Sequence, residues 1–132
     1  MALRRSACTT LTGESFFPLV AQGKQPKLTS NRYGIGRVVE MALAHIGNDT
    51  PIHLSFDVDA LDPQWAPSTG TPVRGGLTLR EGDFICECVH ETGNLVAMDL
   101  VEVNPSLESV GASETIRTGC SLVRSALGDT LL

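Results

Sequence analysis

An apolar segment that ends in closely spaced aspartates constrains the fold of this chain more than any other feature. Residues 52–56 have the length and character of a buried strand, and Asp57 and Asp59 follow it. If the strand extends through them, alternation between its faces points both carboxylates the same way, with their Cα atoms roughly 6.5 Å apart. Two carboxylates on one face repel each other unless a cation or a shared proton lies between them. The pattern therefore predicts a divalent metal site, and such oxygen donors favour Mg²⁺ or Mn²⁺ over Zn²⁺.

Helical and strand patterns alternate along the rest of the chain. The expected elements are a helix over 35–46, a strand over 52–58, a long loop over 60–77, a helix from about 79 to 93, a strand over 94–103 and a helix over 113–127. The second strand is almost continuously apolar, which is typical of a strand buried on both faces. This order of elements indicates an α/β fold with parallel strands and right-handed crossover helices.

The last two helices carry further signals. Thr78 and Glu81 have the spacing of a capping box, which marks the start of the first of these helices, and Gly93 is a suitable stop. The spacing of apolar residues then predicts the face that each helix turns to the core. The predicted faces hold Phe84, Ile85, Cys88 and Val89 in the first helix and Ile116, Cys120, Val123 and Leu127 in the second.

A third acidic residue, Glu102, lies near the end of the second strand. Because ligands of open α/β sheets bind beyond the carboxyl ends of the strands, we expect Asp57, Asp59 and Glu102 to converge on one edge. Asp62 precedes a proline and is interpreted as a turn former. Asp99, in the middle of the strand, is interpreted as a buried structural hydrogen-bond acceptor.

The three histidines are not expected to bind the metal. His53 shares a face with Asp57 but lies roughly 13 Å back along the strand, too far for both to contact one ion. His45 and His90 end helices, where a cation is favourable. The four cysteines form no Cys-x-x-Cys pair, so we expect free thiols, with disulfides or a zinc site as the alternatives.

Length and charge limit the classes of protein and partner. The chain has 132 residues and a formal net charge of -5, which suits one compact domain with a single core. Because the balance is acidic and no basic cluster occurs, neither nucleic acid nor an anionic membrane is an expected partner. No apolar run approaches the ~20 residues needed to cross a bilayer.

Residues 1–30 differ in character from the rest. They contain Arg4 and Arg5, several hydroxyl side chains and no acidic residue before Glu14. We interpret 1–30 as a disordered tail or linker, with a mitochondrial transit peptide as the alternative because the composition weakly resembles one. Ordered structure is expected from about Asn31, and a mitochondrial location is slightly preferred over a cytoplasmic one.

Several motifs resemble the C-terminal third of the ureohydrolases. They are Ser-Phe-Asp-Val-Asp-Ala-Leu-Asp-Pro at 55–63, Thr-Gly-Thr-Pro at 69–72, Gly-Gly-Leu-Thr at 75–78 and Glu-Val-Asn-Pro at 102–105. The last motif, together with Leu-Arg-Glu-Gly at 79–82, is similar to arginase rather than agmatinase. The resemblance covers about 31–127. It implies that 31–132 is the C-terminal part of an arginase-like α/β domain, with a partial three-layer fold.

The resemblance also implies roles for individual residues. Arginases convert L-arginine and water to L-ornithine and urea at a site with two Mn²⁺ ions. Asp57 matches the carboxylate that bridges the ions, and Asp59 matches a ligand of one of them. Glu102 matches the acid that holds the substrate guanidinium, and Thr71 matches a polar residue close by. The resemblance further implies a homo-oligomer, since Arg80 and Glu81 match a region that contributes to subunit contacts in trimeric arginases.

The remaining metal ligands and the proton-shuttle histidine of arginases come from upstream motifs that this sequence does not contain. We therefore expect a truncated or alternatively spliced arginase, incomplete and inactive as an isolated chain. The alternative is a non-catalytic fragment that interacts with full-length arginase subunits. A third interpretation, a haloacid-dehalogenase-type phosphatase, is disfavoured because no lysine follows Lys27.

Overall fold

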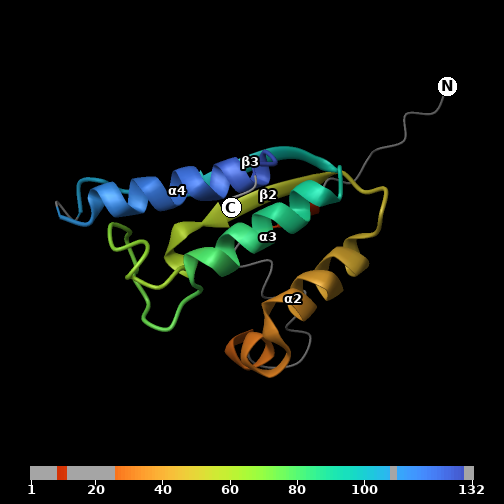
Figure 1. Cartoon of the computed structure of the whole chain (residues 1–132), viewed down its shortest axis with the longest axis horizontal. Coiled ribbons are helices and arrows are strands. Elements are labelled where there is room, and N and C mark those ends of the chain that lie inside the picture. Colours follow the sequence, from red (N-terminus) through yellow and green to blue (C-terminus); the bar gives the residue numbers. More distant parts are fainter. Residues whose placement is uncertain (1–8, 12–25, 108–109, 130–132) are drawn as a thin grey trace.

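The computed structural model describes residues 9–11, 26–107 and 110–129. The elements are β1 (Thr9–Leu11), α2 (Pro26–Ile46), β2 (Ile52–Asp57), the 3₁₀ helix η1 (Val58–Ala60), α3 (Leu79–Glu91), β3 (Leu95–Val101) and α4 (Ala112–Ala126). The strands form a parallel sheet in the order β1-β2-β3. The helices α3 and α4 run side by side along the sheet, and α2 packs against α3 (Figure 1). The expected α/β fold with parallel strands is confirmed.

Two elements begin within residues 1–30, where the sequence analysis expected none. In the sheet, β1 pairs with β2 in parallel, with Thr9 opposite Ile52. Three residues show no periodicity, so the sequence carries no signal for this strand. The start of α2 at Pro26 agrees with the preference for proline in the first turn, where its missing N–H costs no helical hydrogen bond. A non-helical Gly34 interrupts α2, and the apolar spacing that predicts a helix starts only after it.

The division into a tail at 1–30 and a domain at 31–132 stays a prediction, since most of 1–25 lies outside the described residues. None of the described helices combines the length and the apolar character that crossing a membrane requires.

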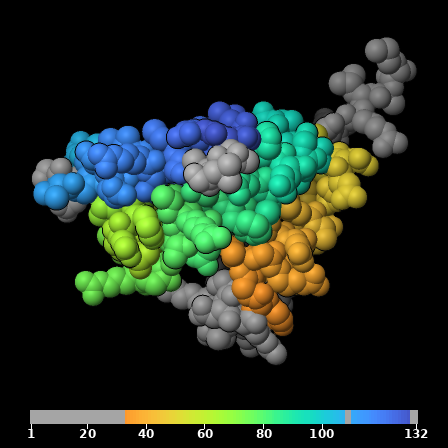
Figure 2. Space-filling model, viewed as in Figure 1, coloured from red at the N-terminus to blue at the C-terminus, as the bar shows by residue number. Residues whose placement is uncertain are grey.

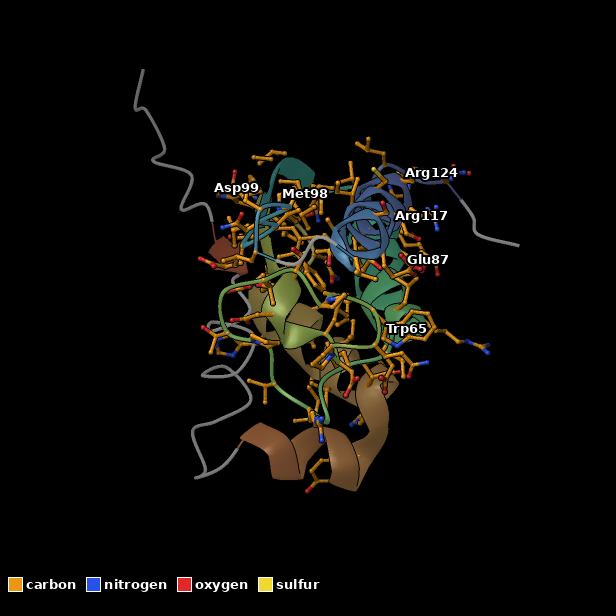
Figure 3. All side chains as sticks on the ribbon, turned by 90° about the vertical axis from the view of Figure 1, so that its left-hand side faces the viewer. Trp65, Glu87, Met98, Asp99, Arg117 and Arg124 are labelled. Atoms are coloured by element: carbon orange, nitrogen blue, oxygen red, sulfur yellow. The ribbon has the colours of Figure 1, made fainter. Side chains whose placement is uncertain are left out.

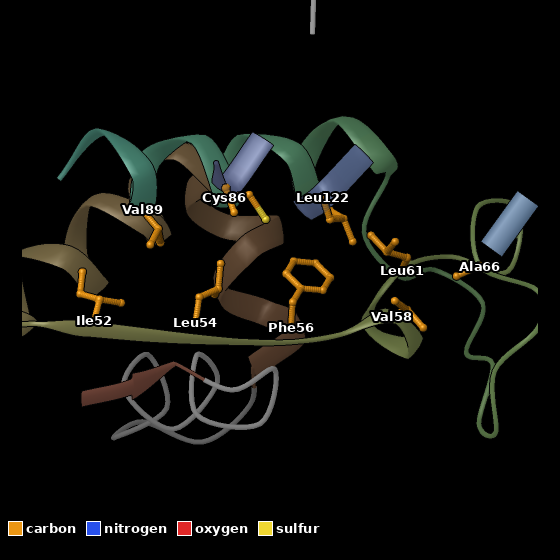
Figure 4. Packing of buried hydrophobic residues seen from close by; sticks show 10 residues of the cluster. Ile52, Leu54, Phe56, Val58, Leu61, Ala66, Cys86, Val89 and Leu122 are labelled. Carbon is orange, nitrogen blue, oxygen red and sulfur yellow. The ribbon is translucent and has the colours of Figure 1, made fainter. Parts of the chain in front are cut away.

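The hydrophobic core lies between β2 and the helices (Figure 4). Alternate residues of β2 are buried, as expected for a strand with one face toward the helices. The buried cluster comprises Ile52, Leu54, Phe56, Val58, Leu61, Ala66, Cys86, Val89, Leu122 and Ala126. Full burial of a large aliphatic or aromatic side chain contributes about 1.5–3 kcal/mol to the stability of the fold. The cluster therefore holds β2 in place, and the acidic motif follows the end of this strand.

The predicted ends of α3 are confirmed. Thr78 Oγ1 accepts the Glu81 backbone N–H at 3.2 Å, and Glu81 Oε2 accepts the Thr78 backbone N–H at 2.8 Å. Gly93, just after the helix, has a φ of 69°, which an L side chain rarely adopts. Glu81 is thus engaged in capping its own helix.

The predicted core face of α4 is wrong. Ile116 and Leu127 are 44% and 72% exposed, while the helix turns small residues inward. A Cβ at Gly119 would lie 2.8 Å from Leu100 Cδ2, so close packing on β3 excludes larger side chains there. The buried residues are Thr115, Thr118, Gly119, Leu122, Ser125 and Ala126. In space-filling form α4 lies directly along α3 (Figure 2).

The predicted face of α3 is partly wrong. Ile85 and Val89 are buried as expected, but Phe84 is 37% exposed and Cys86 is fully buried in its place. The spacing of apolar residues identifies the buried face of a helix only to within about 100° of rotation, which is the angle between successive residues. The neighbouring Cys86 therefore fits the same pattern nearly as well.

The expectation that β3 is buried on both faces is wrong. Val96 is 65% exposed and Val101 is 40% exposed. In the described part of the chain, β3 pairs only with β2, and the helices cover one of its faces. Asp99 is also exposed rather than buried, but its role as an acceptor is confirmed by a 2.8 Å contact with His53 Nε2.

Candidate functional site

The carboxyl ends of β2 and β3 meet at one edge of the sheet. Asp57, the last residue of β2, is the register partner of Val101, the last residue of β3. Glu102 comes next in the chain, so it follows β3 at the level where Asp57 ends β2. Neighbouring strands lie about 4.8 Å apart, which brings the two acidic residues onto adjacent strand ends. The two strands thus end at the same edge of the sheet, as predicted, with Asp57 as the last residue of β2 and Glu102 directly after β3.

Asp59 reaches the edge by a different geometry from the one expected. The strand ends at Asp57, and residues 58–60 turn into η1. Asp57 Oδ1 accepts the Asp59 backbone N–H at 3.0 Å and thereby caps this short helix. Strand alternation therefore does not set the direction of Asp59, and the expectation of two carboxylates on one strand face is wrong in its detail. The cause is local, because an aspartate before a turn readily accepts the N–H two residues ahead.

Asp62 organises the loop after η1, as predicted. Its Oδ1 accepts the Gln64 backbone N–H at 3.0 Å, and its Oδ2 accepts the Gly75 backbone N–H at 2.8 Å. These backbone hydrogen bonds, from Gln64 first and Gly75 second, lower the pKa of Asp62 from its ordinary value. Because Gly75 lies 13 residues away, this carboxylate ties the two ends of the loop together.

A short backbone bridge closes the same loop. Asp62 N donates to Leu77 O at 2.8 Å, and Leu77 N donates to Ala60 O at 2.9 Å. A Cβ at Gly76 would lie 2.6 Å from Asp62 N and 2.7 Å from Ala60 O, closer than real contacts allow. The glycine is therefore needed for the chain to pass behind η1.

The middle of the loop is buried against α4 and the segment after β3. Ser68 and Thr69 are 0% and 4% exposed, so the loop is only partly the surface feature expected from its composition. Ser68 N donates to Thr115 Oγ1 of α4 at 2.8 Å, and Thr118 Oγ1 donates to Trp65 O at 2.8 Å. Figure 3 views this end of the molecule, with the loop in front and Trp65 below α4.

Glu102 has the φ value of a left-handed residue, 65°, and no other non-glycine residue in the described ranges has a positive φ. This conformation costs a non-glycine residue of the order of 1–2 kcal/mol. Such strain is often found at functional positions, so the observation singles out Glu102 independently of its charge. Its side chain lies beside Gly70, where a Cβ would come within 3.2 Å of Glu102 Oε2. Thr71, the other predicted substrate-binding residue, is exposed next to Gly70.

The histidines have the structural positions that were expected. His53 Nε2 contacts Asp99 Oδ2 at 2.8 Å, and His90 Nδ1 contacts Ala126 O at 3.1 Å. His45 is exposed in the last turn of α2.

The described cysteines are free, and burial is the main cause that raises the pKa of the Cys86 thiol to about 12. Burial also raises the pKa of Cys88. Cys8 lies outside the described residues.

The donors present do not fit a complete site for two metal ions. In the described part of the chain, no three side chains of His, Cys, Asp or Glu are grouped so that they could hold one ion. Asp57 and Asp59 supply two carboxylates from a single turn, whereas octahedral oxygen sites of the Mn²⁺ type need six ligands, of which water supplies several. The described residues could therefore supply only a part of the ligands that such a site needs.

Sequence reasoning missed the glycine contacts that shape this edge. Gly70 lies within a motif that the sequence analysis quoted, and Gly76 within another. The only available signal was the presence of glycine between polar residues in a long loop. That signal indicates a turn but does not reveal which side chain packs against the missing Cβ.

The fold and the acidic strand ends define an α/β protein of the arginase type. An arginase structure from Bacillus subtilis superimposes with a TM-score of 0.74 and 38% identity, over 80% of this chain and 39% of that one. The arginase of Entamoeba histolytica in complex with L-ornithine superimposes with a TM-score of 0.70 and 29% identity, over 78% of this chain and 34% of that one.

The chain belongs to the arginase family, whose model matches residues 28–128. An arginase of Emericella nidulans is 94% identical over 102 residues, which are 77% of this chain and 32% of that protein. The chain thus spans about a third of the length of this relative. The recognition of an arginase segment from its motifs is confirmed.

Proposed function

We propose that this chain is an arginase-type ureohydrolase segment, which contributes the arginine-facing edge of a site that converts L-arginine and water to L-ornithine and urea. The observation that carries the proposal is the register of β2 and β3, which places Asp57 and Glu102 on adjacent strand ends. Both residues also lie within the segment that matches the arginase family model. The Entamoeba histolytica relative was solved in complex with L-ornithine, the amino-acid product of this reaction.

In this proposal Glu102 receives the guanidinium group of the substrate. A carboxylate accepts charge-assisted hydrogen bonds from this planar cation, often through both oxygens. Glu102 is exposed at the sheet edge and is therefore accessible to a ligand. Thr71 offers a hydroxyl nearby, next to the glycine that contacts Glu102.

Asp57 and Asp59 are the proposed metal ligands. Their carboxylates have the donor chemistry of Mn²⁺, the ion of the family, but the described residues do not complete a shell. We therefore expect weak binding of the ion and no sustained turnover by the isolated chain. We also expect no role for nucleic acid or membrane.

A second candidate function is a non-catalytic fragment that docks on full-length arginase subunits. The observation that favours it is the position of β3 at the edge of the sheet, where it pairs only with β2 in the described part of the chain. Val96 of this strand is also 65% exposed, on a face of the sheet. Strand edges of this kind pair readily with other chains. If tagged chain recovers no intact arginase at physiological concentration, this candidate fails.

A Mn²⁺-binding measurement tests the proposed metal ligands. Binding is detected as a loss of the electron paramagnetic resonance signal of the free ion. We expect the purified chain to bind the ion weakly and the Asp57→Ala variant to lose this binding. Asp49→Ala removes the same charge from an exposed turn before β2 and should bind as wild type. Equal binding by Asp57→Ala and wild type would contradict the assignment.

A further inference from the structure

Glu102 is held in its left-handed conformation by contacts on both sides. Val101, before it, belongs to β3 and is in register with Asp57. Two residues later, Asn104 N donates to Ser68 O at 3.1 Å, and Ser68 Oγ donates to Asn104 O. Between them, Val103 packs against the core. The chain therefore has only Glu102 and Val103 in which to turn from the strand to the Ser68–Asn104 pair.

The Ser68–Asn104 pair is itself anchored. Ser68 is fully buried, and its backbone N–H donates to Thr115 Oγ1 at 2.8 Å. Thr115 is also fully buried, in the first turn and a half of α4. The loop on one side of Glu102 is consequently fixed to a helix, and the strand on the other side is fixed to the sheet.

Gly70 follows this anchored segment and lies against the Glu102 carboxylate. A Cβ at position 70 would lie 3.2 Å from Glu102 Oε2, tighter than nine in ten real Cβ contacts. Gly70 does not have a positive φ, so its φ does not itself call for glycine. A side chain at position 70 would therefore press on the tip of the Glu102 side chain, and Oε2 would have to move by a few tenths of an ångström.

We propose that Gly70 is a positioning residue for Glu102. The space left by the missing Cβ sets where the carboxylate lies, and the Ser68–Asn104 pair holds the two segments at this separation. Added volume at position 70 displaces Oε2 and changes the direction in which the carboxylate accepts hydrogen bonds. For a planar guanidinium ligand, whose paired N–H groups need a fixed carboxylate plane, this displacement weakens binding. The last step rests on the proposed function, whereas the positioning does not.

A double-mutant cycle tests the contact without any ligand. In the otherwise wild-type chain, Gly70→Ala should lower the urea midpoint of unfolding. In a chain that carries Glu102→Ala and so lacks the carboxylate, Gly70→Ala should cause no such shift. Gly36→Ala adds a methyl group where the nearest atom would be 3.9 Å away, and it should behave alike in both backgrounds. An equal shift for Gly70→Ala in both backgrounds would overturn the proposal.

Carbon-13 NMR of labelled glutamate carboxylates adds a measurement that does not depend on the global stability of the chain. Gly70→Ala should shift the Glu102 δ-carbon resonance and weaken its response to L-arginine at least threefold, while Gly36→Ala leaves both unchanged. An unshifted resonance in Gly70→Ala would also overturn the proposal. If wild type shows no response to L-arginine but the cycle shows coupling, the guanidinium role fails and the positioning stands.

Discussion

Asp57 Oδ1 accepts the backbone N–H of Asp59 at 3.0 Å, so the first carboxylate of the acidic motif holds the turn that carries the second. Asp57 therefore has a structural role as the cap of η1 in addition to its proposed role as a metal ligand. Substitutions that keep the cap but remove the charge separate these two roles.

Asp57→Asn should retain most of the stability, because an asparagine side chain can accept the same backbone N–H. Asp57→Ala should lower the free energy of unfolding by about 1 kcal/mol, the usual cost of losing a helix cap. Urea unfolding measures both, and Mn²⁺ binding should be weakened in both. Equal stability of the two variants would contradict the capping role.

Gly76→Ala should lower the free energy of unfolding by about 1–3 kcal/mol, the range for overpacking. The added Cβ would meet Asp62 N and Ala60 O at 2.6 and 2.7 Å, and backbone atoms cannot rotate away. Gly36→Ala is the matched control and should be neutral or slightly stabilising, as alanine favours helices. Thermal or urea unfolding of the two variants gives the comparison, and an unchanged stability of Gly76→Ala would contradict the close approach of Gly76 to the Asp62 and Ala60 backbone.

Thr69→Val should be neutral or stabilising by up to about 1 kcal/mol. Thr69 Oγ1 is buried without a hydrogen-bond partner in the described structure, so its removal loses no bond and relieves a desolvated group. Thr115→Val makes the same chemical change at a hydroxyl that accepts Ser68 N at 2.8 Å and should cost about 1–3 kcal/mol. Urea midpoints in the reverse order would contradict this account.

Asp83→Asn should change the pH dependence of stability. Asp83 is 9% exposed, and burial raises its pKa above the ordinary 3.8, although hydrogen bonds from Ser125 and Ser121 act in the opposite direction. A carboxyl with a raised folded-state pKa contributes stability below its unfolded pKa and loses this contribution as the pH rises through the folded value. The free energy of unfolding of the variant, relative to that of wild type, should therefore increase as the pH is raised through the folded-state pKa of Asp83.

Urea unfolding at a series of pH values measures this difference. Subtracting the two curves removes the contribution of the other titratable groups, since both chains share them. A difference that is constant with pH, or that favours wild type increasingly at higher pH, would show that the buried carboxyl does not titrate in the expected sense.

The features predicted well from the sequence are those set by local patterns. The apolar segment at 52–56 and the Thr78–Glu81 capping box involve residues within one element, and the structure reproduces both. The meeting of Asp57 and Glu102 follows from topology, because parallel strands end at the same edge.

The features predicted poorly depend on contacts between elements. The inward face of α4 is chosen by the limited space over Leu100, where Gly119 fits, and not by the apolar stripe that contains Ile116. The direction of Asp59 depends on a turn that the sequence analysis treated as a continuing strand. Neither the contact of Gly70 with Glu102 nor the anchoring of Ser68 can be read from spacing, since their partners lie more than 30 residues away.

Urea release from L-arginine in the presence of Mn²⁺ measures whether this segment contributes carboxylates to an arginase site. The measurement compares the purified chain with a chimera in which residues 28–128 replace the matching segment of the Emericella nidulans arginase. We predict that the chimera releases urea, that Asp57→Ala and Glu102→Ala abolish this release, and that the isolated chain releases none. Sustained, Asp57-dependent turnover by the isolated chain, or full activity of the chimera without either carboxylate, would contradict the account.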